Sequence, residues 1–328
     1  MLKVLLITDN RAGHINISNG IIERLKQKVE VEITQIDVIF RLKLLIKLAT
    51  FIVNKFNLRN KENIEFLIKL FYKNLTIPKG NFDLIISTGG DTAFLNIFLS
   101  KLFNIPNIYC SSLRGISPDL FTYTLSLVDH NIPNEIVVDL APLYVEIKPK
   151  TLEGKYIAIL IGGPTKIYQF KGEEFIEMVK SIINLANKMG YKILLTTSRR
   201  TPVSVEEKLE KLCKNNIIKE AVLYNKNPKK VMNFFLSNAD IVFCTEDSGN
   251  MITEAILSRK KVYTVKSKKI KFNEFFYNFI QKLEQKKFIH SVEVNKIDKI
   301  TFEEKFNLIE QSPAKIVVEK IKKILKDK

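Results

Sequence analysis

Residues 241–255 read IVFCTEDSGNMITEA: a short apolar run, a polar turn and then a helical pattern. The run Ile241–Cys244 has the length and composition of a buried strand. From Gly249 onward, apolar residues recur at helical spacing. A buried strand that passes through a short turn into a helix is the repeating unit of a parallel α/β sheet.

The same unit recurs along the chain in two series. Apolar, β-branched runs predict strands at 4–7, 31–36, 84–87, 156–161, 191–196, 221–223, 241–244 and 262–265. Helical patterns follow most of them, at 18–28, from 91 onward, and at 173–189, 205–213, 229–237 and 250–258. We therefore predict an α/β protein with two Rossmann-like domains.

The two series meet at residues 147–154, IKPKTLEG, a polar stretch with Pro and Gly that is typical of an interdomain linker. With 328 residues the chain is long enough for two cores. We predict an N-terminal domain of residues 1–150 and a C-terminal domain of residues 151–328. Residues 313–326, PAKIVVEKIKKILK, predict an amphipathic helix that could return to the N-terminal domain.

The chain has a formal net charge of +17, with 52 Lys and Arg against 35 Asp and Glu. This surplus of positive charge favours binding to phosphates, anionic lipid or nucleic acid, but it does not distinguish these partners. Lysines on solvated surfaces explain much of the surplus. Because no nucleic-acid-binding module is recognisable, we expect no specific nucleic-acid partner. Cys110, Cys213 and Cys244 lack metal-ligand spacing and the histidines are dispersed, so we predict no metal site.

The first ten residues, MLKVLLITDN, predict a buried strand and not a signal peptide, and the apolar stretch 44–53 is too short to cross a bilayer. We therefore expect a cytoplasmic protein. Within the basic, apolar segment 36–78, residues 40–56 read FRLKLLIKLATFIVNKF, typical of a cationic helix lying on an anionic membrane surface. Helix-on-sheet packing gives the same period. Peripheral attachment to the inner face of the membrane and ordinary core packing both stay open.

Polar residues directly after strands are candidate site residues, because ligands of open α/β sheets bind beyond the carboxyl ends of the strands. Asp9, Asn10, Arg11, Gly13 and His14 follow the first strand. Imidazole titrates near neutral pH, so His14 could remove a hydroxyl proton while Asp9 orients it or acts itself. Gly13 would let the backbone turn tightly toward a ligand. The alternative is a polar loop that only satisfies turn backbone.

A second turn, residues 87–92 with the sequence STGGDT, joins a predicted strand to a predicted helix. At Gly89 and Gly90, backbone N–H groups and the helix dipole could bind an anion or a ligand hydroxyl. The more ordinary expectation is that Asp91 caps the helix.

The second series combines glycines, cations and carboxylates at its strand ends. Its candidate residues are Gly162, Gly163, Lys166, Ser198, Arg199, Arg200, Thr245, Glu246, Asp247, Ser248 and Glu254. The glycines permit close approach of a bulky ligand, and Lys and Arg neutralise phosphate. The helix that begins near Ser248 could receive a diphosphate, and Glu254 could accept hydrogen bonds from ribose or sugar hydroxyls. Alternatively, Asp247 and Ser248 cap this helix and Glu254 is solvated.

Five motifs in order along the chain carry a family resemblance: DNRAGHIN, VDHN with His130, GGPTKIYQF, TTSRRTP and TEDSGNMITEA. They resemble the elongated-mitochondria, or mitochondrial fission, family, whose bacterial members are regarded as GT-B type glycosyltransferases. TTSRRTP followed by TEDSxxMxxEA is the most specific part. The family usually has a more basic version of the 87–92 turn, so a phosphate role is not carried over to that turn.

The resemblance implies two Rossmann-like domains facing a cleft. A nucleotide-sugar donor would be held mainly by the second domain, through the candidate residues given above for the second series. Asp9 and His14 would be catalytic. The other residues expected on the acceptor side are Asn10, Arg11, Gly13, Gly89, Gly90 and His130.

The sequence therefore predicts a glycosyltransferase that moves a sugar from a nucleotide-sugar donor to a hydroxyl of a saccharide or lipid-linked acceptor of the cell envelope. The nucleotide sugar is a co-substrate, and no cofactor or metal is expected because Arg199 and Arg200 would neutralise the leaving diphosphate. A non-catalytic peripheral membrane adaptor of the same fold is the alternative. A dinucleotide enzyme such as a nucleotide-sugar epimerase is disfavoured, because no GxGxxG follows the first strand.

Overall fold

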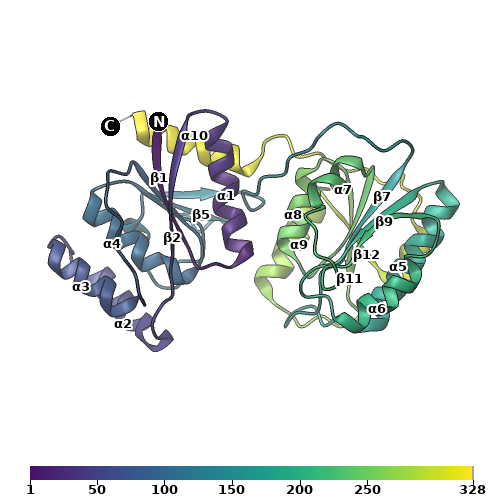
Figure 1. Ribbon diagram of the computed structural model, residues 1–328, viewed down its shortest axis with the longest axis horizontal. Coiled ribbons are helices and arrows are strands. Elements are labelled where there is room, and N and C mark those ends of the chain that lie inside the picture. Colours follow the sequence, from purple (N-terminus) through teal and green to yellow (C-terminus); the bar gives the residue numbers. More distant parts are fainter. Residues whose placement is uncertain (327–328) are drawn as a thin grey trace. The chain divides into compact units, whose positions relative to one another are not determined.

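The computed structural model describes residues 1–326, and its contacts divide the chain into two compact units (Figure 1). Unit 1 contains Met1–Tyr144 and the chain from Gln311 onward, and unit 2 contains Val145–Glu310. The division therefore falls slightly before the boundary predicted at residue 150.

The predicted linker, residues 147–154, packs on unit 2 and does not bridge solvent. Its backbone N–H groups donate to side chains at the end of a unit 2 helix: Lys148 to Ser237 Oγ at 3.0 Å, and Thr151 to Asn238 Oδ1 at 2.8 Å. A Pro- and Gly-containing composition indicates that the segment is irregular, but it does not reveal that the backbone finds hydrogen-bond partners in one unit.

Unit 1 is built on a six-stranded parallel sheet with the strand order β2-β1-β3-β4-β5-β6. Its strands are β1 (Leu2–Thr8), β2 (Val31–Asp37), β3 (Leu84–Ser87), β4 (Asn107–Tyr109), β5 (Tyr123–Ser126) and β6 (Glu135–Val137). Its α-helices are α1 (Ala12–Lys26), α2 (Ile46–Lys55), α3 (Lys61–Phe71), α4 (Ala93–Phe103) and α10 (Pro313–Lys326), and its short 3-10 helices are η1 (Lys43–Leu45), η2 (Gly90–Thr92) and η3 (Pro118–Leu120).

Helices cover both faces of this sheet, because alternate residues of a strand point to opposite sides. Leu5 and Ile7 of β1 pack in one core with residues of α2, α3 and α4. Val4 and Leu6 pack in the other core, with residues of α1 and with Val317 of α10. Helix α10 lies beside α1, as predicted for the last amphipathic helix (Figure 1). The last helix thus completes the core of the first unit.

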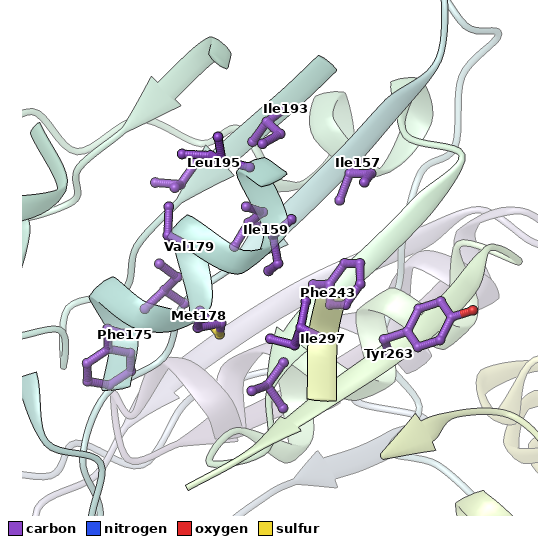
Figure 2. Packing of buried hydrophobic residues seen from close by; sticks show 14 of the residues in the cluster. Ile157, Ile159, Phe175, Met178, Val179, Ile193, Leu195, Phe243, Tyr263 and Ile297 are labelled. Atoms are coloured by element: carbon purple, nitrogen blue, oxygen red, sulfur yellow. The ribbon is translucent and has the colours of Figure 1, made fainter. Parts of the chain in front are cut away.

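Unit 2 repeats the architecture with the strand order β12-β11-β10-β7-β8-β9. Its strands are β7 (Tyr156–Leu160), β8 (Lys192–Thr196), β9 (Ile218–Val222), β10 (Ile241–Thr245), β11 (Lys261–Lys266) and β12 (His290–Glu293). Its helices are α5 (Gly172–Met189), α6 (Val203–Leu212), α7 (Met232–Asn238), α8 (Gly249–Leu257), α9 (Glu274–Gln285) and the 3-10 helix η4 (Val294–Lys299). Figure 2 shows Phe175, Met178 and Val179 of α5 packed against the β7 and β8 side chains.

The prediction of two Rossmann-like α/β units is confirmed, whereas several local expectations are wrong. Strands β4, β5, β6 and β12 were not predicted, because runs of three or four residues that mix polar and apolar side chains show no clear period. The predicted helix within residues 40–56 is largely present: η1 leads directly into α2, so residues 43–55 are continuously helical. The chain is then irregular until Asn60 caps α3 by accepting from the Glu62 and Asn63 N–H groups. Among the helices described for residues 1–326, none combines the length and apolar character needed to cross a membrane.

Candidate functional site

Three loops of unit 2 converge because their strands are neighbours in the sheet. Strands β10, β7 and β8 are adjacent and parallel, so their carboxyl ends share one edge. Thr245 Oγ1, after β10, accepts from the Gly162 N–H at 2.8 Å. Thr201, after β8, donates its hydroxyl to the Gly162 carbonyl at 2.5 Å and accepts from the Ser198 N–H at 3.0 Å. The GGP, SRR and TED motifs therefore form one hydrogen-bonded cluster.

Asp247 lies at the centre of this cluster. Its side chain is fully buried, and its Oδ2 accepts from Arg200 Nη2 at 2.5 Å and from the Gly163 N–H at 3.1 Å. Its Oδ1 is buried without a hydrogen-bond partner. Burial raises the pKa of Asp247, and Arg200 opposes that rise. The alternative that Asp247 caps α8 is wrong, because Asp247 instead fixes the Arg200 guanidinium and the glycine loop.

The glycine pair is needed because the loops approach each other too closely for a side chain. A Cβ on Gly162 would overlap the Asp247 carboxylate, and one on Gly163 would overlap the backbone carbonyl of Arg200. We predict that Gly163→Ala lowers the free energy of unfolding by about 1–3 kcal/mol, because backbone cannot move aside as a flexible side chain can. Chemical denaturation of the purified variant measures this.

Gly172→Ala is the matched control for that substitution. Gly172 lies in the first turn of α5, and a Cβ there would meet Val205 Cγ2 at an ordinary 3.4 Å. We expect this variant to match or slightly exceed the stability of the parent chain, because Ala loses less backbone conformational entropy on folding than Gly. Equal stability of Gly163→Ala and Gly172→Ala would show that the close approach at Gly163 carries no energetic weight.

The remaining donor-side residues divide into buried and exposed groups. Glu246, predicted as a donor-binding residue, is almost fully buried, and it accepts hydrogen bonds from Tyr168, Thr264 and Ser291. Lys166 and Arg199 are exposed. The Glu246 and Asp247 carboxylates are thus held inside the unit, whereas the cations Lys166 and Arg199, from the other two loops, face outward.

The start of helix α8 is partly buried. Ser248 is its N-cap residue, but its side chain makes no capping hydrogen bond, so that part of the alternative is also wrong. Glu254 lies one turn further along and is only partly exposed, not fully solvated. Desolvation raises the pKa of Glu254 to about 7. Near neutral pH this carboxyl can therefore either donate or accept a hydrogen bond.

Two functional side chains of unit 2 were missed by sequence reasoning. Thr201 joins the β7 and β8 loops, and Tyr168 donates its hydroxyl to Glu246 Oε2 at 3.1 Å. Thr201 lies within TTSRRTP, so its position beside the arginines was a usable signal. Tyr168 lies in GGPTKIYQF but had no local signal, because its partner is 78 positions away.

Unit 1 has its own cluster at the carboxyl ends of β1 and β3. His14 Nδ1 lies 3.0 and 2.9 Å from the two Asp9 oxygens, and the Asp9 side chain is almost fully buried. An ionised carboxylate only accepts hydrogen bonds, so Nδ1 is the donor, and in the neutral imidazole Nε2 carries the lone pair. Arg11 lies between two carboxylates, 3.6 Å from Asp9 and 3.5 Å from Asp91. The predicted pairing of His14 with Asp9 is present as an oriented imidazole.

One prediction about the loop after β1 and one about the 87–92 turn are wrong. Helix α1 begins at Ala12, so Gly13 and His14 lie in its first turn and not in a loop. The tight turn is made by Asn10, which adopts a left-handed conformation with φ of 60° that Asn tolerates. Asp91 does not cap a helix, because neither η2 nor α4 has a side-chain cap. It pairs with Arg11 instead.

Gly89 brings the second turn against this cluster. It has a φ of 104°, and a Cβ there would overlap His14 Nδ1. A Cβ on Gly90 would lie 2.7 Å from an Arg114 guanidinium nitrogen, so Arg114 is a neighbour that sequence reasoning missed. His130 is exposed and contacts Glu135 at 2.8 Å. The structure thus gathers Asp9, His14 and Gly89, while the contacts of His130 are with its own loop.

Over the described part of the chain, residues 1–326, the structure contains no group of three or more His, Cys, Asp or Glu side chains arranged to hold a metal ion.

Comparison with protein families gives one match, to the family described as mitochondrial fission ELM1, over residues 139–319. This range covers more than half of the chain and includes all of the unit 2 cluster. A search of curated proteins gives no match.

Solved structures share the fold at low identity. UDP-GlcNAc 2-epimerase from Methanocaldococcus jannaschii has a TM-score of 0.58 and 15% identity, with 100% of both chains covered. MnaA from S. aureus, solved with UDP, has a TM-score of 0.53 and 14% identity, covering 91% of this chain and 86% of that one. MurG from Acinetobacter baumannii has a TM-score of 0.50 and 12% identity, covering 99% and 91%. The fold is the GT-B fold of glycosyltransferases and nucleotide-sugar epimerases.

Proposed function

The chain belongs to the mitochondrial fission ELM1 family, and we propose that it is a glycosyltransferase that transfers a sugar from a nucleotide-sugar donor to a hydroxyl group of a saccharide or lipid-linked acceptor. The observation that carries the proposal is the convergence of three strand-end loops of unit 2 on the buried Asp247–Arg200 pair. The same fold holds UDP in MnaA, which supports a nucleoside diphosphate as the ligand class.

The proposed donor site uses both polar backbone and cations. Gly162 and Gly163 leave room for a bulky ligand, and the start of α8 supplies N–H groups and the positive end of the helix dipole. Lys166 and Arg199 are exposed and can approach the diphosphate, while Arg200 is already oriented by Asp247. A guanidinium held in place before the ligand arrives loses less entropy on binding.

Asp247 has a positioning role in this proposal. It is fully buried, and its hydrogen bonds go to Arg200 and to the Gly163 N–H. Glu254 would accept a hydrogen bond from a ribose or sugar hydroxyl, which its partial exposure on α8 permits. Glu246, buried beneath these groups, would support the loop through Tyr168.

The proposed chemistry is displacement at the anomeric carbon. His14 Nε2 takes the proton of the acceptor hydroxyl, with Asp9 fixing the ring through Nδ1. The acceptor oxygen forms a bond to the anomeric carbon. The bond from that carbon to the diphosphate oxygen breaks, and its electron pair leaves with the nucleoside diphosphate, whose charge Arg200, Arg199 and Lys166 offset. Protein cations thus supply the neutralisation that the leaving group needs.

A thermal-shift screen against nucleoside diphosphates and nucleotide sugars tests the donor site. Selective binding of one nucleotide should stabilise the protein by about 2.7 kcal/mol at a hundredfold excess over Kd. Arg199→Ala should reduce the shift. Lys192→Ala is the matched control, because Lys192 is the first residue of β8 and so lies at the amino-terminal end of the strand, away from the proposed donor site. The absence of a thermal shift with every nucleotide would contradict the proposed donor site. Conversion of a nucleotide sugar without an acceptor would indicate an epimerase of the same fold.

A membrane adaptor is the second candidate, and the exposed surface of η1 and α2 favours it. Leu44 is 89% exposed, and Leu48 and Phe51 are about half exposed, beside Lys43 and Lys47. The opposite face of α2 buries Ala49 and Val53 in the core shared with α4, so the helix packs on the unit with one side and presents apolar groups with the other. Binding to anionic vesicles together with the absence of any nucleotide shift would favour this candidate.

A further inference from the structure

Unit 2 carries a second exposed apolar surface, between β11 and α9. Residues 266–277 read KSKKIKFNEFFY. The lysine–aromatic surface consists of Lys268, Lys269, Ile270, Lys271, Phe272, Phe275 and Tyr277, all of them exposed. Phe272 is 72% exposed, and the three other apolar side chains are each about half exposed. Large apolar groups gathered on a surface indicate an interaction site more often than scattered ones do.

The backbone of this surface is held in place. The Gln169 N–H donates to the Lys269 carbonyl at 2.9 Å, and the Lys271 N–H donates to the Ile167 carbonyl at 2.8 Å. Asn273 then caps α9 by accepting from the Phe276 N–H at 2.9 Å. The antiparallel bridge between Tyr168 and Ile270 belongs to the same pairing. The apolar side chains are therefore displayed by a fixed backbone.

Alternation separates the charges from the apolar groups. In an extended segment successive side chains point to opposite sides, so Lys269 and Lys271 share one side and Ile270 and Phe272 share the other. Lys268 pairs with Glu177 at 2.8 Å. Exposed Glu274 lies in the same stretch, so the positive charge beside the apolar side comes mainly from Lys269 and Lys271.

A pocket continues the apolar side inward. It has a volume of about 130 Å³, and most of its lining is apolar, with Ile270, Phe272, Phe276 and Tyr277 among the lining residues. Glu246, Lys266, Asn273 and Gln281 also line it. Tyr168 and Phe276 pack edge to face with ring centroids 5.4 Å apart, and Phe272 lies 5.7 Å from Tyr277. Phe272 and Tyr277 thus belong both to the exposed surface and to the lining of the pocket.

We propose that the lysine–aromatic surface docks unit 2 on an anionic lipid bilayer, with Phe272 and Phe275 entering the interface and the lysines facing the lipid headgroups. Lysines beside inserted apolar groups complement an anionic headgroup layer over an acyl boundary. No arginine belongs to this surface, so it lacks the planar guanidinium that gives bidentate recognition of phosphates and bases. The surface is distinct from that of η1 and α2, and it does not rest on the donor site.

The absence of Trp from the sequence permits a direct test. Phe272→Trp introduces a single indole at the most exposed position of the surface. With vesicles of mixed phosphatidylcholine and phosphatidylserine, its emission should move to shorter wavelength and brominated acyl chains should quench it. Phe234→Trp, on α7 in the same unit and 38% exposed in the parent chain, is the matched control and should show neither change.

Charge and apolar contributions are then separated on the Phe272→Trp background. Each lysine neutralised should lower the vesicle partition coefficient roughly fivefold, so Lys269→Gln with Lys271→Gln should lower it roughly twentyfold or more. Phe275→Ser should also weaken binding. An unchanged Phe272→Trp spectrum with anionic vesicles, or equal shifts in both Trp variants, would overturn the proposal. A spectral change with single-stranded RNA but not with vesicles would assign the surface to nucleic acid instead.

Discussion

Replacing His14 with Ala is expected to lower turnover by roughly 10²–10⁴-fold while donor binding is retained, because a positioned general base contributes about that much. The Asp9 carboxylate holds His14 Nδ1 at 2.9 Å, so Nε2 is the nitrogen that can accept a proton. Release of nucleoside diphosphate in the presence of acceptor measures turnover. The nucleotide-induced thermal shift measures donor binding in the same preparation.

Two further variants make this prediction specific. Asp9→Asn keeps the size of the side chain but removes the charge that selects the tautomer, so it should also lower turnover with little change in donor affinity. His130→Ala is the matched control, because His130 is exposed and contacts Glu135 at the start of β6. Equal loss of donor binding and turnover in His14→Ala would assign His14 to ligand binding and remove it as the base.

Replacing Arg200 with Ala is expected to weaken nucleoside diphosphate binding roughly 100-fold and to destabilise the fold by about 1–3 kcal/mol. The affinity falls because a guanidinium donates to phosphate in a fixed geometry. The fold is weakened because Asp247, fully buried, loses its charged partner. Since the Arg200 side chain is 37% exposed, water can replace part of it, so the loss should be smaller than for a fully buried pair.

The stability loss in Arg200→Ala should depend on pH. Burial raises the pKa of Asp247 above its ordinary value of 3.8, and Arg200 holds that rise down. Without Arg200 the folded pKa rises further. A carboxyl whose pKa is higher in the folded state binds more protons there, so stability falls as pH rises through the interval between the two values. The difference between the variant and the parent chain should therefore be small below about pH 4 and should grow toward neutral pH.

A double variant separates the two roles of Arg200. Asp247→Asn keeps an acceptor for the Gly163 N–H while removing the buried charge. Arg200→Ala combined with Asp247→Asn should therefore recover most of the stability lost in Arg200→Ala, with no pH-dependent difference. Donor affinity should stay low, because no guanidinium is restored. Recovery of donor affinity in the double variant would mean that Arg200 only neutralises Asp247 and does not contact the diphosphate.

Sequence reasoning succeeded where a local pattern is strong. The strand at 84–87 and the helix at 313–326 have the predicted bounds, because each is an apolar run or an amphipathic period that can be read without its partners. It failed where the period is short or changed by tertiary contacts. Strand β4 has three residues, and the first helical turn of the stretch 40–56 is the 3-10 helix η1, which leads directly into α2. Helix α1 starts six positions before the predicted Ser18, because Ala12 to Ile17 carry no clear apolar stripe.

The candidate site divides in the same way. Position after a strand identified His14, Asp9, the glycine pair and Arg200, because the carboxyl edge of a parallel sheet is known from local strand signals alone. Sequence reasoning did not find which carboxylates are buried. Asp247 and Arg200 are 47 positions apart, and Glu246 meets Tyr168 across 78 positions. Burial and ion pairing depend on groups brought together by strand order, so residues 245–247 look like a solvated turn in isolation.

The sequence by itself determined the α/β class, the two series of βα units and the residues available at each strand end, because apolar periodicity and turn chemistry act over a few neighbouring residues. Only the tertiary structure decided that β10, β7 and β8 lie side by side and that Asp247 fixes Arg200 inside the fold. Those outcomes depend on long-range burial, in which a charge removed from water is stabilised only by a partner that folding brings within hydrogen-bonding distance.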